Sequence, residues 1–169
     1  MNIREINKRD IPEVLKLFNR NNSSQESANK LLKEEILEMF NNNSSRPKFL
    51  VAEENQKIVG YIGYAPSRIN YRVYQIFFLQ VDKNFQNQGI GTKLLDKAIK
   101  DIKSKKRYKK DDYLILLTSV KPAYYKNKFG FKTLTRIKVN GSCLMALRVW
   151  GGYFYYGENP HSKLWGIKR

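Results

Sequence analysis

A strand that runs into a glycine-containing helix start is the feature that most restricts how this chain can fold. The apolar run Ile76–Leu79 leads into a polar turn, and a helical pattern begins at Ile90, between Gly89 and Gly91. The first N–H groups of a helix have no partner within it, and with the helix dipole they attract anions. Glycine at 89 and 91 lets a phosphate approach the backbone without meeting a Cβ. The segment therefore predicts a pyrophosphate site at a strand-to-helix junction.

Two other phosphate-binding loops fit this segment poorly. A dinucleotide-binding fingerprint needs a third glycine near position 94, which is Leu94. A Walker loop needs a glycine five residues before Gly91, where Gln86 stands. An ordinary helix start, in which the glycines only ease the turn, remains the alternative.

Apolar periodicity and turn residues predict a mixed sheet with helices on its faces. A chain of 169 residues is long enough for one core but not for two. We expect Asp10 and Glu13 to form a capping box, and Asn140-Gly141 to be a two-residue hairpin turn. The expected strands are Asn2–Ile6, Phe49–Glu53, Lys57–Tyr64, Arg72–Val81, Tyr113–Val120, Phe131–Val139 and Ser142–Val149, and the expected helices follow Asp10, span Leu32–Phe40, and cover Ile90–Ser104 and Pro122–Phe129.

The glycine loop and a later segment together resemble the GNAT superfamily of acetyl-CoA-dependent N-acetyltransferases. The family signature, Gln/Arg-x-x-Gly-x-Gly/Ala, is met in full by residues 86–91, Gln-Asn-Gln-Gly-Ile-Gly. A second family mark, a Tyr on a short helix before Gly-Phe, is met by Tyr124 and Tyr125 before Gly130-Phe131. The resemblance implies one α/β (α+β) domain over residues 1–149, with a central mixed, mostly antiparallel sheet flanked by about four helices. The aromatic and glycine-rich tail, residues 150–169, lies outside it.

The resemblance also implies how acetyl-CoA would bind as cosubstrate. Leu79 and Val81 would offer backbone groups to the pantetheine and polarise the thioester carbonyl. Core packing is the plain alternative for these two residues, and both roles are compatible. Backbone amides would cradle the CoA pyrophosphate, with Thr92 at the edge, and would come from Gln86, Asn87, Gln88, Gly89, Ile90 and Gly91.

In this family a Tyr before Gly-Phe usually protonates the departing CoA thiolate. The usual position, four residues before the glycine, is occupied here by Lys126. One extra residue in the short helix or at its exit would make Tyr125 the acid, and Tyr124 is the alternative. Packing of both tyrosines at an interface is the remaining interpretation.

No general base is identified from the sequence. Gln75 stands where histone-modifying relatives carry a carboxylate, and it cannot serve as a base. Glu53 and Glu54 end a strand and could reach the cleft through a water, although such residues are more often solvated. Ser119 occupies the place of an Asn that is frequent in the family.

The net charge of +17 raises affinity for anions, including nucleic acids. A composition rich in Lys, Asn and Ile also follows from AT-rich codons, so an anionic cofactor plus compositional drift is favoured over a nucleic-acid partner. The basic run Lys100–Lys110 is interpreted first as a solvated loop and second as a contact for an acidic partner. The alternatives to acetyl transfer are a non-catalytic nucleic-acid-binding module, a CoA sensor and an enzyme for another acyl group.

Cys143 and His161 are the only residues of their kinds, which gives no support to an internal disulfide, a metal site or a covalent nucleophile. No apolar stretch is long enough to cross a bilayer and no secretory signal is recognised, so a cytoplasmic location is expected. We expect direct attack of a primary amine on acetyl-CoA. The acceptor, a small molecule or a protein, is not indicated by any motif.

Overall fold

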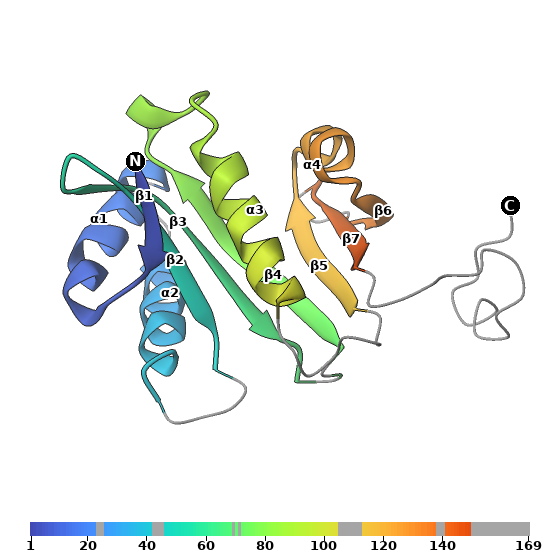
Figure 1. Ribbon diagram of the computed structural model, residues 1–169, viewed down its shortest axis with the longest axis horizontal. Coiled ribbons are helices and arrows are strands. Elements are labelled where there is room, and N and C mark those ends of the chain that lie inside the picture. Colours follow the sequence, from blue (N-terminus) through green and yellow to red (C-terminus); the bar gives the residue numbers. More distant parts are fainter. Residues whose placement is uncertain are drawn as a thin grey trace, which may run out of the picture.

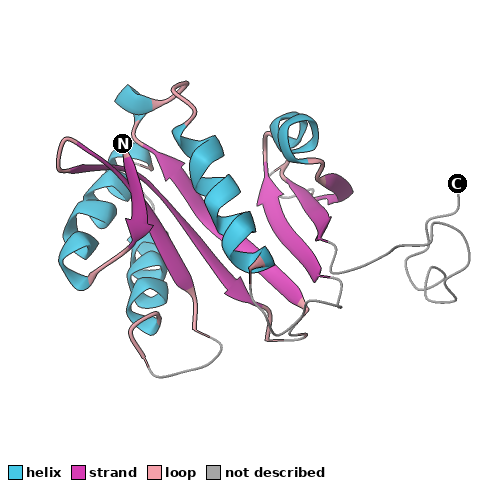
Figure 2. Ribbon diagram, viewed as in Figure 1, coloured by secondary structure: helices cyan, strands magenta, loops and turns pink. Residues whose placement is uncertain are grey.

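The computed structural model describes residues 1–22, 26–41, 46–68, 70, 72–104, 113–137 and 141–149. Within these residues a seven-stranded sheet carries α1 and α2 on one face and α3 and α4 on the other (Figures 1 and 2). The predicted α/β domain with a mixed sheet is confirmed. The elements in order are β1 (Asn2–Glu5), the 3₁₀ turn η1 (Lys8–Asp10), α1 (Ile11–Asn21), α2 (Glu26–Glu38), β2 (Lys48–Glu54), β3 (Lys57–Pro66), β4 (Val73–Val81), the 3₁₀ turn η2 (Lys83–Phe85), α3 (Ile90–Lys103), β5 (Tyr113–Ser119), α4 (Pro122–Phe129), β6 (Lys132–Arg136) and β7 (Cys143–Val149).

The sheet has the strand order β1-β2-β3-β4-β5-β7-β6, and β4–β5 is its one parallel pair. That pair is short, because β4 residues 73–75 meet β5 residues 114–116 and no pairing continues beyond them. On its other side β4 pairs with β3 as far as Val81. Figure 1 shows β4 and β5 diverging toward their carboxyl ends. The second half of β4 therefore has one edge without a strand.

Two apolar clusters, one on each face of the sheet, hold the layers together. Phe18 of α1 and Leu32 and Ile36 of α2 are buried against β2 and β3. On the other face α3 buries the stripe predicted from its periodicity. That stripe consists of Leu94, Leu95, Ala98 and Ile102, which are all fully buried.

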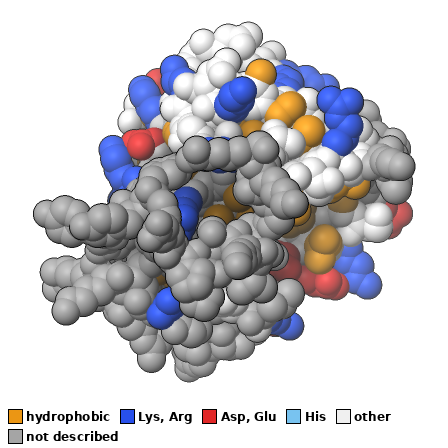
Figure 3. Space-filling view, turned by 90° about the vertical axis from the view of Figure 1, so that its right-hand side faces the viewer, with side chains coloured by type: hydrophobic (Ala, Val, Ile, Leu, Met, Phe, Trp, Pro, Cys, Tyr) orange, Lys and Arg blue, Asp and Glu red, His pale blue; other side chains and the backbone are white. Residues whose placement is uncertain are grey.

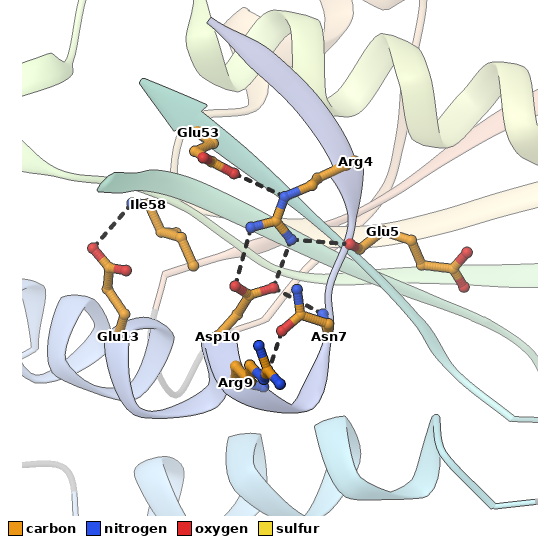
Figure 4. A network of polar contacts seen from close by, with 8 residues as sticks. All are labelled: Arg4, Glu5, Asn7, Arg9, Asp10, Glu13, Glu53 and Ile58. Carbon is orange, nitrogen blue, oxygen red and sulfur yellow. Dashed lines mark hydrogen bonds and ion pairs between the residues drawn. The ribbon is translucent and has the colours of Figure 1, made fainter. Parts of the chain in front are cut away.

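The start of α1 is capped one turn earlier than the sequence predicts. The Asn7 side chain accepts a hydrogen bond from the Arg9 N–H at 2.9 Å, and the Asp10 carboxylate accepts one from the Asn7 N–H at 2.8 Å (Figure 4). The Glu13 carboxylate instead accepts the Ile58 N–H of β3 at 3.0 Å. The predicted Asp10–Glu13 capping box is therefore wrong, because Glu13 joins the helix to the sheet and leaves capping to Asn7 and Asp10.

The hairpin of β6 and β7 forms as predicted, but with a different register. The Ile137 N–H donates to the Ser142 carbonyl at 2.6 Å, so four residues, not two, separate these partners. All five β6 residues are exposed, whereas Cys143, Met145 and Val149 of β7 are buried. A strand without a buried face does not fix its own register. The alternating pattern of β6 therefore misled the prediction of a turn confined to Asn140-Gly141.

Candidate functional site

The junction of β4 with α3 leaves a set of backbone donors open. Gly89 is the N-cap of α3 and has a φ of +77°, a left-handed conformation that favours glycine. The first bond of the helix runs from the Lys93 N–H to the Gly89 carbonyl at 3.0 Å. The N–H groups of Gly89, Ile90, Gly91 and Thr92 therefore have no partner within the helix. No side chain caps this end, so the donors are available to an anion.

The two glycines of the junction serve different purposes. A Cβ at Gly89 would meet no atom within 4 Å, so space does not require glycine there, but the backbone does. Gly91 has no left-handed backbone, and a Cβ there would lie 3.5 Å from Val81 Cγ2, an ordinary contact. Gly89 therefore shapes the turn, while neither the backbone nor the surrounding protein atoms require glycine at position 91.

The pairing of β4 with β3 is interrupted by a bulge. Gly63 pairs with Phe77 and Tyr61 pairs with Gln80, so two β4 residues, Phe78 and Leu79, lie opposite a single β3 residue. Phe78 has a φ of +52°, which is rare for a bulky residue and costs roughly 1–3 kcal/mol. The bulge resets the alternation, because Phe77 and Phe78 pack toward α1 and α2 whereas Leu79 and Val81 pack toward α3.

The carbonyl of Val81 is held by side chains instead of by a strand. The Asp82 N–H donates to the Val59 carbonyl of β3 at 2.8 Å, so the preceding Val81 turns its own polar groups to the open edge. Its oxygen accepts the Asn21 and Gln86 side-chain amides, each at 3.1 Å. Both lone pairs are then used. The carbonyl is thus occupied, which leaves the Val81 N–H as the backbone group that a ligand at the open edge could meet. The contact with this carbonyl is a role of the Gln86 side chain that the signature did not reveal.

An ion pair anchors the end of α1 to the same strand end. The Arg20 guanidinium lies 2.8 Å from the Asp82 carboxylate, which is nearly buried. The other oxygen of Asp82 accepts the Asn84 N–H at 3.0 Å and starts the turn η2. The carboxylate of Asp82 is thus neutralised close to the anion-attracting end of α3.

The short helix α4 is regular and ends at Gly130 with a φ of +76°. The Gly130 N–H donates to the Lys126 carbonyl at 3.0 Å, and the Phe131 N–H donates to the Tyr125 carbonyl at 3.3 Å. The helix and its exit are regular and contain no bulge, and the place of an extra residue relative to the family pattern stays a prediction. The two tyrosines have to be compared by the positions of their hydroxyl groups.

The two hydroxyl groups point to different places. The Tyr124 hydroxyl lies 2.8 Å from the Thr92 hydroxyl in the first turn of α3. Tyr125 is half-buried, with its ring 6.0 Å from that of Phe131 and its hydroxyl beside the Ser119 side chain. Burial raises the pKa of Tyr125 above its ordinary value of 10.0, and the hydrogen bond with Ser119 opposes this shift.

The strand register gives the height of Ser119 on the sheet. Gln75 of β4 pairs with Leu116 of β5 in the last position where the two strands meet. Three residues further along the two strands lie Phe78 and Ser119. Parallel strands that start in register advance equally, so Ser119 ends β5 at the height of the β4 bulge. The Tyr125 hydroxyl therefore lies at the level of Phe78 and Leu79, whereas the Tyr124 hydroxyl lies at the first turn of α3.

Glu53 and Glu54, considered as bases, lie away from the open edge of β4. Their strand β2 is separated from β4 by β3. The Glu53 carboxylate lies 2.8 Å from the Arg4 guanidinium (Figure 4), and the Glu54 carboxylate lies 3.7 Å from the amino group of Met1. Both carboxylates are thus held in ion pairs, and reach to the cleft through a water stays a prediction.

Several predictions lie wholly or partly outside the described residues. These concern His161, the tail from Trp150 onward, and the basic run, of which the structure describes Lys100–Ser104. Within the ranges that are described, no helix is long and apolar enough to span a membrane. In the same ranges, no group of three or more His, Cys, Asp or Glu residues is arranged to hold a metal ion.

Comparisons with known proteins agree with this geometry. The family model described as Acetyltransferase (GNAT) family matches residues 11–131. No curated protein matches the chain. A GNAT-family acetyltransferase from Desulfovibrio desulfuricans is similar, with a TM-score of 0.71 and 18% identity, over 89% of this chain and 99% of that chain.

Two further solved structures share the fold. An acetyltransferase of the GNAT family from Staphylococcus aureus Mu50 has a TM-score of 0.67 and 23% identity, over 87% of this chain and 98% of that chain. A GNAT-family acetyltransferase from Brucella melitensis, solved in complex with acetyl-CoA, has a TM-score of 0.61 and 19% identity, over 86% of each chain. At these identities the likeness shows the fold alone. Because the family model covers more than half of the sequence, the chain belongs to the GNAT family of acetyltransferases.

Proposed function

We propose that this protein transfers an acetyl group from acetyl-CoA to a primary amine. The observation that carries the proposal is the open amino-terminal turn of α3, which lies next to the strandless edge of β4. The turn offers unpaired N–H donors to a phosphate, and the strand edge offers backbone groups to an amide-bearing chain. CoA combines these two chemistries. The complex of the Brucella melitensis relative with acetyl-CoA supports the same cosubstrate.

The backbone from Gln86 to Gly91 would bind the pyrophosphate, with Thr92 at its edge. Leu79 and the N–H of Val81 would hold the pantetheine and the thioester carbonyl along the open edge of β4. A backbone N–H aimed at the thioester oxygen stabilises the negative charge that develops when the amine attacks. The attack is direct, so the enzyme forms no covalent intermediate.

Basic side chains of the carboxyl-terminal part favour an anionic cosubstrate. The described residues of 113–149 include no Asp or Glu. Figure 3 shows Lys and Arg side chains, together with some Asp and Glu side chains, on the described part of one face. Such an excess of basic side chains attracts phosphates in general. The basic residues are Lys121, Lys126, Lys128, Lys132, Arg136 and Arg148.

Tyr125 is the proposed general acid for the departing CoA thiolate. Its hydroxyl lies beside Ser119, at the height of the bulge where Leu79 would receive the thioester. Since burial raises the pKa of Tyr125 above 10.0, the hydroxyl keeps its proton at neutral pH and can donate it. Tyr124 remains the alternative acid. No side chain is assigned as general base, and the proposal leaves the amine to lose its proton to water.

The test is a thiol-release assay with acetyl-CoA and a panel of primary amines. Tyr125→Phe keeps the ring and its packing, so a large effect has to come from the hydroxyl. General acid catalysis contributes roughly 10²–10⁴-fold, so we expect the variant to lose at least about tenfold in kcat. Tyr124→Phe is the matched control and should keep most of kcat. No turnover with any amine, despite tight binding of acetyl-CoA, would instead favour a CoA sensor.

The pH dependence gives a second check of the acid. The protonated form of Tyr125 is the active one, and it is lost only as the pH rises through a pKa that lies above 10.0. We therefore expect kcat/KM to show no alkaline decline between about pH 6 and pH 10. A decline centred near neutral pH would mean that another group supplies the proton.

A further inference from the structure

We propose that Tyr124 is a cofactor-binding residue, whose hydroxyl pairs with that of Thr92 to hold the phosphate end of CoA. The inference rests on the proposed function and gives the two adjacent tyrosines separate tasks. Tyr125 acts on the thiolate, and Tyr124 sets the affinity for the part of the cofactor that carries the phosphates.

The first support is the position of the hydroxyl pair. Thr92 is the third residue of α3, and its backbone N–H is one of the four that have no partner within the helix. Its hydroxyl lies 2.8 Å from that of Tyr124, which comes from α4. The two hydroxyls therefore lie next to the backbone N–H donors at the start of α3, and one of them is supplied by α4.

The second support is the hydrogen count of the pair. Two hydroxyl groups have two hydrogens, and their mutual bond uses one of them. The other hydrogen is free to donate to a phosphate oxygen beside the Thr92 N–H. A hydrogen bond to a charged acceptor is about twice as strong as a neutral one, so this donor should contribute measurably to the affinity.

The third support is the way in which Tyr124 is held. Its ring lies edge to face against those of Tyr125 and Phe129, at 5.0 and 6.0 Å between centroids. These contacts fix the ring without using the hydroxyl, and the residue is 36% exposed. The ring is thus oriented by packing, and the hydroxyl is turned toward α3 at a surface that a ligand can reach.

The two tyrosine hydroxyls therefore face different partners, Thr92 for Tyr124 and Ser119 for Tyr125. The Thr92 turn attracts the phosphates, whereas Ser119 and Tyr125 lie at the height of the β4 bulge. A hydroxyl at the phosphate end acts on binding and has no proton to give to the thiolate. Loss of the Tyr124 hydroxyl should consequently weaken acetyl-CoA binding and leave the chemical step to Tyr125.

Calorimetric titration with CoA tests the pair without an amine. We expect Tyr124→Phe and Thr92→Val each to raise the Kd about tenfold. The double variant should be little worse than either single one, because the free donor belongs to the pair. Unchanged Kd values in both single variants, with melting temperatures close to that of the wild type, would overturn the inference. A wild type that does not bind CoA would overturn the inference together with the proposed function.

Once an acceptor amine is found, an acetyl donor that lacks the phosphates distinguishes cofactor binding from acid catalysis. S-acetylpantetheine carries the thioester but no phosphate. We expect Tyr124→Phe to lower kcat/KM with acetyl-CoA about tenfold and to cause no comparable loss with S-acetylpantetheine. Equal losses with both donors would show that Tyr124 is the acid and would overturn the inference. A wild type that binds CoA but transfers no acetyl group would refute the proposed function and still leave the titration as a test of the pair.

Discussion

The two edges of β4 are built in different ways. Toward β3, the strand pairs along its length from Tyr74 to Val81, interrupted only by the bulge at Phe78. Toward β5, it pairs at three positions, and beyond them the Asn21 and Gln86 amides satisfy the Val81 carbonyl. One strand is thus a central element of the sheet along one edge and lacks a partner strand along most of the other.

The chemistry of the side chains follows the same division. On the β1–β2 side, charged groups are paired with one another, as in the contact of Arg4 with Asp10 and Glu53 (Figure 4). At the open edge the contacts come from neutral amides, and the carboxylate that follows β4, Asp82, is paired with Arg20. An unpaired carboxylate there would repel an anionic cofactor. The difference predicts that charge substitutions on the β1–β2 side change the stability of the fold. Substitutions at the open edge of β4 should instead change the affinity for acetyl-CoA.

The largest effect is expected on the β1–β2 side of the sheet, at Arg4. Its guanidinium donates to the Asp10 carboxylate at 2.6 and 3.0 Å and to Glu53 at 2.8 Å. Arg4→Met keeps most of the apolar stem but leaves the nearly buried Asp10 carboxylate without its cation. We expect the free energy of unfolding to fall by about 2–3 kcal/mol. Urea denaturation would measure this loss, and the Kd for acetyl-CoA should stay within about twofold of the wild type.

The pH dependence of this loss provides a control. Burial alone raises the pKa of Asp10, but the bonds from Arg4 and the Asn7 N–H outweigh it and hold the pKa below 3.8. A carboxyl with a lowered pKa stabilises the fold above its unfolded pKa, and this contribution disappears as the pH falls through the lowered value. The stability difference between wild type and Arg4→Met should therefore be constant near neutral pH and shrink below pH 3.8. A difference that does not change with pH would argue against the ion pair as its cause.

The next largest effect is expected at the glycine loop. Gly89→Val forces a β-branched residue into a backbone with φ of +77°, at the turn whose N–H groups are proposed to bind the phosphate. We expect a cost in stability of roughly 1–2 kcal/mol and at least about tenfold weaker binding of acetyl-CoA. Both should appear in melting curves, since a ligand that binds the folded state raises the melting temperature.

Gly91→Ala is the matched variant for this comparison. Its backbone is not left-handed, and the added Cβ makes an ordinary contact with Val81, so the unliganded protein should keep its stability. Only the approach of the phosphate is affected, and we expect about threefold weaker binding. Equal stabilisation of the wild type and both variants by acetyl-CoA would contradict a cofactor site at this loop.

The sequence predicted the architecture well because local patterns determine it. The apolar stripe of α3, the buried residues of β5 and the glycine at position 89 each show their role within a few neighbouring residues. The bulge at Phe78 was not predictable, because the run Ile76–Leu79 is apolar throughout and hides a change of alternation. The capping role of Asn7 was missed since it depends on Glu13 being engaged by β3, a contact between residues 45 positions apart.

The site was predicted less completely, for the same physical reason. The signature marked the loop from Gln86 to Gly91, but the use of the Gln86 side chain depends on where the Val81 carbonyl points in the folded sheet. Asn21 was not considered, because nothing in the pattern of α1 marks its last residue as a partner of β4. The contact of Tyr124 with Thr92 joins residues 32 positions apart, so no local pattern of either helix shows it.

The smallest effect, and the sharpest test of the open edge, concerns the two amides on Val81. Asn21→Ala or Gln86→Ala alone leaves the carbonyl with one donor, so each should cost about 1 kcal/mol of stability or less. The double variant leaves the oxygen without a side-chain donor, and the cost of an unsatisfied carbonyl should appear only then. We therefore expect the double loss to exceed the sum of the single losses by about 0.5–1 kcal/mol in a double-mutant cycle. Strictly additive losses would mean that water replaces each amide freely. The pairing with β3 alone would then hold this end of β4 in place.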